Sequence, residues 1–360
     1  MANWYLQNGK DSDVVLSTRI RLVRNLNGFK FLSKCSLEEK DKILSKIKEI
    51  VPSLGYGLEF IDIKNLDDVT KLSLVEKNLV TPEYISKDKN KGLIINKDEN
   101  ICIMINEEDH IKIQVFSSGQ ELENLMNLVI ELDEKIGDLI EYSYSDKFGF
   151  LTSSPVNIGT GMKASVIVHL PSLTLTGNLT KILRIVNNLG MSIKGVNGDG
   201  TQDIGDMYQI SNNQTIGITE KEIIANVKNI TEKIIEQERL ARKYLGKNEM
   251  ELEDRVYGAV GTINYASKLS QNECRKLLSD IKLGVDLGII KEIDDSKVRK
   301  LELYNKSGNL QKYIGKTLDG YERDIKRAEV IKQILNERSW ILWHINLQIE
   351  LKKQLKLQMM

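Results

Sequence analysis

Two adjacent carboxylates stand at the end of a short apolar run. Glu107 and Glu108 follow residues 101–105, and Asp109 and His110 come directly after them. Carboxylates beside a buried strand are costly to desolvate unless they bind a cation. The pattern predicts a site for a guanidinium, although such a turn taken alone is more often a solvated surface feature. His110 by itself favours a structural hydrogen-bonding role over a proton shuttle.

A second candidate is a pair of alternating arginines. In the segment Ser17-Thr18-Arg19-Ile20-Arg21 both arginines fall on one face of an extended chain. Guanidinium groups in that pattern suit phosphates, because their planar forks contact two oxygens at once. A third segment, residues 155–161, reads Pro-Val-Asn-Ile-Gly-Thr-Gly. Each of these segments alone is typical of an ordinary protein surface, so the prediction of a site depends on the occurrence of all three together.

Together, and in this order, the three segments resemble the signatures of the guanidino (phosphagen) kinases. Within that superfamily the chain is most similar to the bacterial protein-arginine kinases. It begins almost at the Arg19 strand, without the long helical N-terminal domain of creatine and arginine kinases, and residues 323–328 read Arg-Asp-Ile-Lys-Arg-Ala. That stretch matches the family's Arg-Asp-x-x-Arg-Ala motif for phosphoarginine, so the resemblance covers about residues 1–335.

The resemblance implies an α+β fold and two domains. A guanidino-kinase catalytic domain, an antiparallel sheet flanked by helices, is expected over residues 1–245. A small all-helical domain that binds phosphoarginine and dimerises is expected over residues 246–335. Residues 336–360 form an atypical tail, rich in tryptophan and then in lysine and glutamine, to which the resemblance does not extend.

The resemblance also implies ATP as cofactor, with Mg²⁺ held through the nucleotide's own phosphates and no dedicated metal ligands in the protein. Cations around the phosphates stabilise the charge that spreads in a loose transition state. The positions that match the family's nucleotide site are Ser17, Thr18, Arg19, Ile20, Arg21, Asn78, Lys112, Lys163, Ala164, Ser165, Val166, Ile167, Lys194, Gly195, Val196, Asn197, Gly198 and Asp199.

Catalysis requires a positioned guanidinium, because this group is protonated at neutral pH and is a poor nucleophile. Glu108 matches the family's second glutamate and is the expected principal carboxylate, with Glu107 orienting it. Asp199 supplies a further carboxylate from a glycine-containing loop that can close over substrate. Ser154 and Asn157 mark the substrate loop; Ser154 replaces a reactive cysteine, so redox control at this position is not expected.

Several positions depart from the family pattern. Lysine replaces arginine at Lys112, Lys163 and Lys194, which keeps the charge but loses the planar fork. Asn78 replaces a histidine and Gln202 replaces a glutamate. These departures leave open a catalytically weakened adaptor that only binds phosphoarginine proteins. A kinase of free guanidino compounds is the third and least favoured alternative.

Arg323 and Arg327 stand four residues apart on one face of a predicted helix, with Asp324 beside the first. An ordinary charged helix face would read the same way, but the family motif favours a phosphoarginine site. Two arginines would hold the phosphoryl group and the aspartate would take the guanidinium. Product bound there would then regulate the kinase domain, which predicts an allosteric enzyme.

The amino-acid composition limits the classes of binding partner that we expect. The 51 basic and 51 acidic residues cancel, which indicates neither a nucleic-acid nor a membrane partner. No apolar run approaches the length that spans a bilayer, and the N-terminus lacks a signal segment, so a cytoplasmic protein is expected. Three unrelated cysteines support neither disulfides nor a zinc site. By resemblance, the partners are proteins with an exposed arginine, a Clp-type protease machinery in stress control, an activator protein and a second copy of the chain.

The periodicity of apolar residues predicts the strands and helices that position these side chains. Strands are predicted at residues 14–22, 92–95, 101–105, 111–115, 166–169 and 207–210. Helices are predicted at residues 119–136, 174–189, 219–245, 255–269, 271–285, 295–304 and 318–335. The helix from Thr219 carries Glu222 three positions on, a capping box, and its end before Gly246 is the expected domain boundary.

Overall fold

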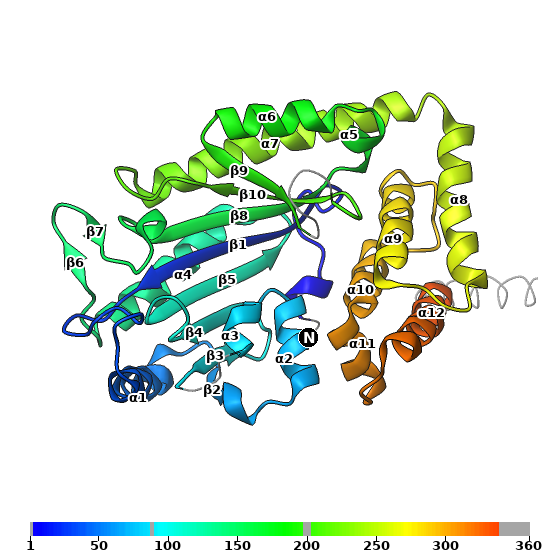
Figure 1. Cartoon of the computed structure of the whole chain (residues 1–360). Coiled ribbons are helices and arrows are strands. Elements are labelled where there is room, and N and C mark those ends of the chain that lie inside the picture. Colours follow the sequence, from blue (N-terminus) through cyan, green and yellow to red (C-terminus); the bar gives the residue numbers. More distant parts are fainter. Residues whose placement is uncertain (1–2, 87–89, 197–202, 338–360) are drawn as a thin grey trace, which may run out of the picture.

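The computed structural model describes residues 3–86, 90–196 and 203–337. An eight-stranded sheet dominates its N-terminal part, and every neighbouring pair of strands is antiparallel (Figure 1). From edge to edge the strands are β2 (Leu58–Asp62), β3 (Gly92–Asn96), β4 (Ile101–Ile105), β5 (Ile111–Ser118), β1 (Val15–Arg24), β8 (Met162–His169), β10 (Met207–Asn212) and β9 (Met191–Gly195). The six predicted strands are all present, whereas β2 and β9 were not predicted.

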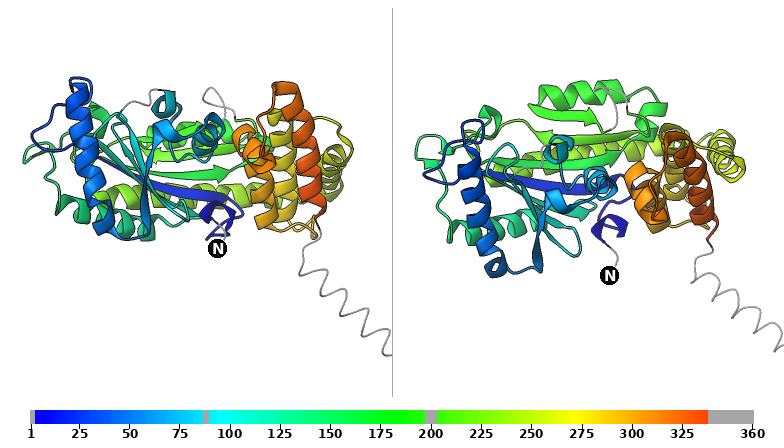
Figure 2. Two further views of the ribbon diagram at one scale, coloured as in Figure 1. Left: turned by 90° about the horizontal axis from the view of Figure 1, so that it is seen from below. Right: turned by 60° about the horizontal axis from the view of Figure 1, so that its bottom comes forward.

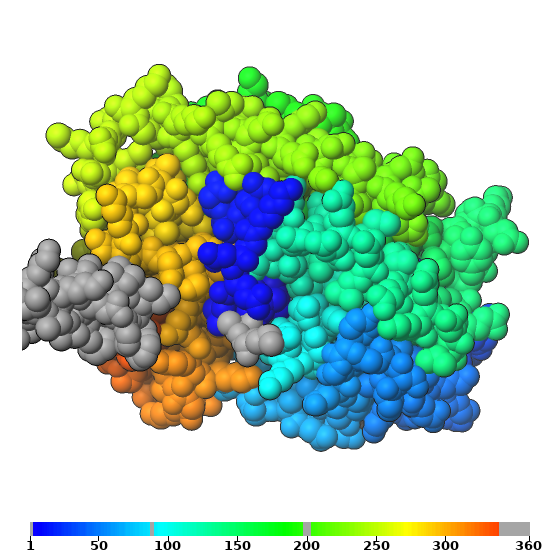
Figure 3. Space-filling model, turned by 180° about the vertical axis from the view of Figure 1, so that it is seen from behind, coloured from blue at the N-terminus to red at the C-terminus, as the bar shows by residue number. Residues whose placement is uncertain are grey.

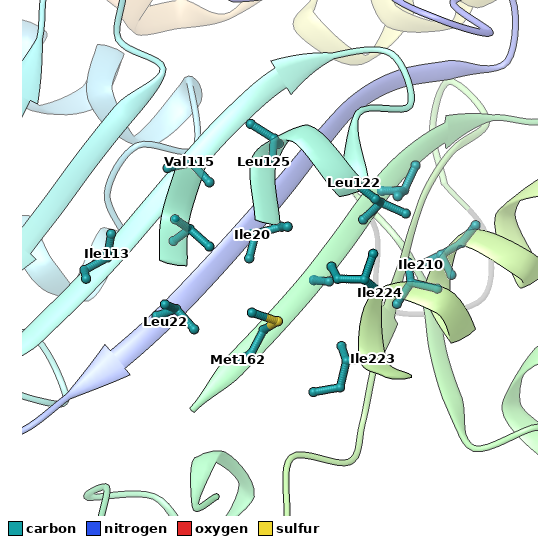
Figure 4. Close-up of a cluster of buried hydrophobic side chains, with 14 of the residues drawn as sticks. Ile20, Leu22, Ile113, Val115, Leu122, Leu125, Met162, Ile210, Ile223 and Ile224 are labelled. Atoms are coloured by element: carbon teal, nitrogen blue, oxygen red, sulfur yellow. The ribbon is translucent and has the colours of Figure 1, made fainter. Parts of the chain in front are cut away.

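One face of the sheet is covered by long helices. Along β1, Ile20 and Leu22 are fully buried and point toward α4 (Leu122–Gly137) and α7 (Glu220–Leu245) (Figure 4). Side chains alternate along a strand, so burying these residues turns their neighbours in β1 to the opposite face. Arg19 and Arg21 therefore lie on the face that α4 and α7 leave uncovered, whereas Arg24 at the end of β1 pairs with Asp133 of α4.

Shorter elements complete this sheet domain. They are η1 (Trp4–Leu6), α1 (Leu37–Leu54), η2 (Ile63–Asn65), α2 (Asp68–Glu76), α3 (Pro82–Ser86), β6 (Tyr144–Ser145), β7 (Gly149–Phe150), η3 (Pro155–Asn157), α5 (Pro171–Leu175) and α6 (Leu179–Asn188). The single helix predicted at 174–189 is two helices, because Gly177 between them has a φ of 73°. The capping box of α7 is confirmed, with Thr219 and Glu222 each accepting from the other's backbone N–H.

A bundle of five helices follows at one end of the sheet (Figure 2). They are α8 (Glu249–Tyr265), α9 (Gln271–Asp286), α10 (Asp295–Asn305), α11 (Ser307–Ile314) and α12 (Gly320–Asn336). Their apolar side chains form a core of their own, which includes Val256, Leu278, Leu301 and Ile331. We call residues 249–337 the helical domain. The prediction missed α11 and began α8 six residues too late.

The N-terminal segment lies between the sheet domain and the helical domain (Figure 3). Arg299 Nη1 of α10 donates to the carbonyl of Leu16 at 3.0 Å, and Lys282 Nζ of α9 donates to that of Ser12 at 3.1 Å. Nearby, His169 at the end of β8 forms a buried hydrogen bond of 2.8 Å with Ser279 of α9. The helical domain is thus tied directly to the start of β1.

The predicted atypical tail lies, apart from residues 336 and 337, outside the described residues. In the described part of the chain, no helix is long and apolar enough to cross a membrane.

Candidate active site

Arg19 and Arg21 of β1 lie on the uncovered face of the sheet, and we call this face the groove. Arg21 lies opposite Lys163 of β8, and Arg19 lies opposite Ser165. Arg19 donates from Nε to Ser165 Oγ at 3.4 Å and from Nη2 to Gln209 of β10 at 3.3 Å. Residues directly opposite in an antiparallel pair share a face, so these side chains line one polar strip.

The same alternation divides the predicted nucleotide residues into two sets. Ala164 and Val166 are buried in the core, as is Ile20, and only the residues between them reach the groove. Thr18 is buried and donates to the carbonyl of Gly119 at 2.6 Å. Within the two predicted runs, the groove-facing residues are therefore Ser17, Arg19, Arg21, Lys163, Ser165 and Ile167.

Cations in this strip destabilise one another's charge. Burial lowers the pKa of Arg19 to about 10, and the charge of Arg21 contributes to the shift. Burial lowers the pKa of Lys163 as well, and three cationic neighbours lower it further: Arg21, Lys194 and Arg19. With a pKa of about 10, Arg19 remains a cation at neutral pH. A bound anion would relieve this repulsion, which makes the strip a site for phosphate groups.

The acidic turn connects β4 to β5 at the end of this strip. Glu107 accepts from Lys112 Nζ at 2.6 Å and from the Thr81 hydroxyl at 3.0 Å. Burial alone would raise the pKa of Glu107, but Lys112, Thr81 and the backbone N–H of Glu108 lower it below its usual value. Lys112 is thus already paired with a carboxylate. Glu108 is exposed to solvent, as a group that meets a substrate must be.

Asp109 and His110 hold the turn in place. Asp109 is fully buried, and its Oδ1 accepts from the Asn25 amide at 2.7 Å and from the backbone N–H of Ser153 at 2.6 Å. His110 Nδ1 accepts from the backbone N–H of Leu26 at 3.0 Å, so Nε2 carries the proton and donates to the Lys30 carbonyl at 2.9 Å. Burial lowers the pKa of His110, which keeps the ring neutral.

The contact from Asp109 also fixes the loop that contains the predicted substrate residues. Ser154 is half-buried and precedes η3, and its carbonyl accepts from the Thr152 hydroxyl at 2.8 Å. Asn157 is buried in η3, and its backbone N–H donates to the Ser154 carbonyl. The loop and the acidic turn therefore share one end of the groove.

Arg21 lies between the cationic strip and the acidic turn. Burial lowers its pKa, while the charges of the acidic turn, Glu107, Glu108 and Asp109, oppose that shift. Arg21 is thus close enough to feel the acidic turn and also lies opposite Lys163. An anion on the strip and a cation at the turn would lie next to each other.

Asn78 lies at the other end of the groove. It is exposed, has a φ of 60°, and lines a small hollow with Ser17 and Arg19. Sequence reasoning missed four residues of this hollow: Trp4, Lys77, Phe116 and Gln209. Trp4 stacks on Phe116 with ring centroids 5.4 Å apart, and a tryptophan so near the N-terminus was the one available signal.

The predicted phosphoarginine residues lie on α12, far along the chain from the groove. Arg327 is 1 % exposed and donates to the carbonyls of Leu269 and Asn305, each at 2.8 Å. Its Nη1 also pairs with Asp324 at 2.6 Å. Arg323 is half-exposed. The helix face therefore offers Arg323 and Asp324 to solvent, with Arg327 behind them.

Part of the predicted site cannot be placed. Asn197, Gly198, Asp199 and Gln202 lie outside the described residues, although β9 leads toward them and places the exposed Lys194 opposite Gln209. Within the described ranges, no three His, Cys, Asp or Glu side chains gather closely enough to hold a metal ion.

This geometry agrees with the families that the chain matches. Residues 42–241 match the ATP:guanido phosphotransferase C-terminal catalytic domain. The class is therefore that of the ATP:guanido phosphotransferases. Solved structures of that class share the fold: lombricine kinase has a TM-score of 0.56 at 23% identity, covering 65% of this chain and 68% of its own. A duplicated taurocyamine kinase from Schistosoma mansoni has a TM-score of 0.59 at 23% identity, covering 74% of this chain and 40% of its own.

The C-terminal region and similar proteins identify the family within this class. Residues 249–343 match the C-terminal domain of protein-arginine kinase McsB. A protein-arginine kinase of Halothermothrix orenii is 41% identical over 93% of this chain and 97% of its own length. That of Bacillus pumilus is 39% identical over 93% of each. The chain belongs to the protein-arginine kinase family. The resemblance read from the three motifs is confirmed, and so is the α+β fold.

Proposed function

We propose that this protein transfers the γ-phosphoryl group of ATP to arginine side chains of other proteins. The observation that carries the proposal is the position of Arg21, which lies opposite Lys163 on the cationic strip and within electrostatic reach of the acidic turn. A triphosphate on the strip and a guanidinium at the turn would then be neighbours. Such positioning is the main demand of phosphoryl transfer.

The chemical step is a displacement at the γ-phosphorus. A guanidino nitrogen of the substrate attacks, an N–P bond forms, and the bond from the γ-phosphorus to the bridging oxygen of ADP breaks. The guanidinium gives up one proton in the process. Exposed Glu108 is the group proposed to orient the guanidinium and draw off that charge, with Glu107 held beside it by Lys112.

The cations have separate roles in this proposal. Arg19, Arg21 and Lys163 contact the phosphates from the face of the sheet, joined by Lys194 from β9. Lys112 is buried in its pair with Glu107, so we assign it to fixing the acidic turn and only indirectly to the nucleotide. Mg²⁺ is proposed to enter with ATP, bound by phosphate oxygens whose charge it partly neutralises.

A second candidate function is an adaptor that binds phosphoarginine proteins without phosphorylating them. The lysines at positions 112, 163 and 194 and the paired state of Lys112 favour it, since a lysine offers a point charge where arginine offers a fork. Incubation with ATP and an arginine-containing protein, followed by mass spectrometry for acid-labile phosphate on arginine, separates the two. Free arginine as acceptor tests the third alternative, a phosphagen kinase.

The helical domain is proposed to bind phosphoarginine and regulate the sheet domain. In this arrangement Arg323 contacts the phosphoryl group, Asp324 takes the guanidinium, and Arg327 holds Asp324 in place. Bound product would act through the contacts that tie α9 and α10 to the start of β1. Such coupling requires that the ligand bind two states of the protein differently.

The cellular role is proposed by likeness to the family. Phosphorylated proteins would be delivered to a Clp-type protease under stress, with an activator protein and a second copy of the chain as partners, in the cytoplasm. Co-purification of the tagged protein with protease subunits, with and without the Glu108→Gln substitution, tests this role. Equal recovery from both strains would contradict a part played by phosphorylation.

A further inference from the structure

A cavity of about 150 Å³ lies where the sheet domain meets the helical domain. The sheet domain contributes Ser17, Asn78, Ile167 and Met207 to its wall. From the helical domain, α9 and α10 contribute Arg275, Lys282, Val298, Arg299, Glu302 and Leu303. Ser17, Asn78 and Ile167 also line the small hollow that contains Arg19. The cavity therefore continues the proposed phosphate groove toward the helical domain.

The size and lining of the cavity suit an aromatic ring. Ile167 and Met207 on one side and Val298 and Leu303 on the other give it apolar walls. A cavity of about 150 Å³ is large enough for one aromatic ring, as benzene binding to an engineered cavity of that size shows. Binding sites for small molecules combine such apolar walls with a few polar groups that fix orientation.

Two polar atoms on the helical side lack a partner among the described residues. They are Oε1 of Glu302, an acceptor, and Nη2 of Arg299, a donor, and both are hidden from solvent. The other nitrogens of Arg299 are engaged: Nε donates to Asp295 at 2.9 Å, and Nη1 donates to the Leu16 carbonyl. Both residues line the cavity, and buried polar atoms in proteins are nearly always hydrogen-bonded, so this acceptor and this donor call for a partner.

Electrostatics at Glu302 support this reading. Burial raises the pKa of Glu302 to about 7, against the effect of three cations that lower it: Arg275, Lys306 and Lys282. None of these cations forms an ion pair with Glu302 within the described residues, and two of them have other partners. Lys306 donates to the Glu76 carbonyl at 2.7 Å, and Lys282 pairs with Asp286 at 3.0 Å. A hydrogen-bond donor from a ligand would stabilise the charged carboxylate.

We propose that the helical domain completes the nucleotide site, with Glu302 accepting a hydrogen bond from the nucleoside part of ATP and Arg299 donating one to it. The inference rests on the proposed function, which places the phosphates at Arg19. Two parts of the nucleoside carry a suitable donor: the exocyclic amino group of adenine and the ribose hydroxyls. Glu302 is then a specificity residue for ATP that the catalytic-domain motifs do not contain.

Calorimetric titration of the full-length protein tests the proposal. The ligands are ATP, 2′-deoxy-ATP, inosine triphosphate, which lacks the amino group, and inorganic tripolyphosphate, which lacks the nucleoside. The variants are Glu302→Leu and Glu302→Gln, the second of which keeps the shape of the side chain. Asp280→Asn is the matched control, because Asp280 is a partly buried carboxylate of α9 that pairs with Arg255 and is not part of the cavity wall.

Glu302→Leu should bind ATP at least about tenfold more weakly than wild type, since a hydrogen bond to a charged group is lost. Tripolyphosphate should bind equally well to both, Glu302→Gln should show a smaller loss, and Asp280→Asn should match wild type. A loss that disappears with inosine triphosphate assigns the contact to the amino group, and one that disappears with 2′-deoxy-ATP assigns it to the ribose.

Unchanged ATP affinity in both Glu302 variants would overturn the inference. Equal losses for ATP and tripolyphosphate would also overturn it, because they would show a general disturbance of the site. Wild-type protein that binds neither ATP nor tripolyphosphate would instead refute the proposed function.

Discussion

The pair of Lys112 and Glu107 offers a sharp test of the acidic turn. The two charges are 2.6 Å apart, and their side chains are only 5 % and 12 % exposed. Lys112→Met keeps the length of the side chain but leaves the Glu107 carboxylate partly buried without its cation. Breaking a buried pair in this way typically costs about 3–5 kcal/mol of the free energy of unfolding.

The structure favours the lower end of that range. Glu107 keeps two neutral donors, the Thr81 hydroxyl and the Glu108 backbone N–H, and the charge of Arg21 remains nearby. We therefore expect Lys112→Met to lose about 3 kcal/mol. The double variant Glu107→Gln/Lys112→Met should lose only about 1 kcal/mol, because no charge is left unpaired.

Urea unfolding followed by circular dichroism measures these differences. Lys135→Met is the control, since Lys135 pairs with Glu131 on the exposed surface of α4 and its loss should cost less than about 0.5 kcal/mol. If Lys112→Met costs as little as this control, or if the double variant is less stable than the single one, the assigned role of the pair is wrong.

The pH dependence follows from the lowered pKa of Glu107. A carboxyl whose folded pKa lies below its unfolded value of 4.5 stabilises the fold above pH 4.5 and loses that contribution as pH falls through the folded pKa. The stability difference between wild type and Lys112→Met should therefore be full at neutral pH and shrink below about pH 4.5. A difference that stays constant down to pH 3 would contradict the assignment.

Three further predictions concern the cationic strip and α12. Lys163→Arg should tighten ATP binding several-fold, up to about tenfold, because a fork contacts two phosphate oxygens; unchanged affinity in calorimetry would remove Lys163 from the phosphate site. Arg327→Ala should lower the free energy of unfolding by about 3 kcal/mol, since it leaves the Leu269 and Asn305 carbonyls without their donor. Arg323→Ala should leave stability within about 0.5 kcal/mol of wild type and abolish binding of free phosphoarginine; intact binding would rule Arg323 out.

Local sequence patterns predicted those parts of the site that depend on residues close together in the chain. Alternation in β1 placed Arg19 and Arg21 on one face, and the apolar run of β4 was predicted with its observed bounds. The Thr219 capping box marked the start of α7 because its two hydrogen bonds join residues three apart. Such features carry their own geometry, so a single sequence can reveal them.

Long-range contacts were not predictable in the same way. Arg327 was expected to share one helix face with Arg323, but the sequence did not predict that its side chain reaches the carbonyls of Leu269 and Asn305, which are 58 and 22 residues away. The helix α11 was missed because it contains Gly308, a poor helix former. A Cβ at Gly308 would lie 2.8 Å from Leu72 and from the Ser73 backbone of α2, so close packing explains the glycine.

The pairing of Lys112 with Glu107 is a contact that the sequence did not predict. Lys112 matches a phosphate-binding arginine of the family, yet its ammonium lies against the acidic turn. Burial lowers the pKa of Lys112, and the charge of Glu107 opposes that shift. The sequence shows the two residues five apart, but only the hairpin between β4 and β5 brings them into contact.

The most direct test of the account is a comparison of wild type with Glu108→Gln in phosphorylation of a protein that has exposed arginines. Mass spectrometry of peptides kept at neutral pH would locate phosphate on arginine, and calorimetry would confirm that both proteins bind ATP. We expect phosphoarginine with wild type and at least about a hundredfold less with Glu108→Gln, at similar ATP affinity. Wild-type protein that binds ATP but forms no phosphoarginine, or a Glu108→Gln variant as active as wild type, would contradict the account.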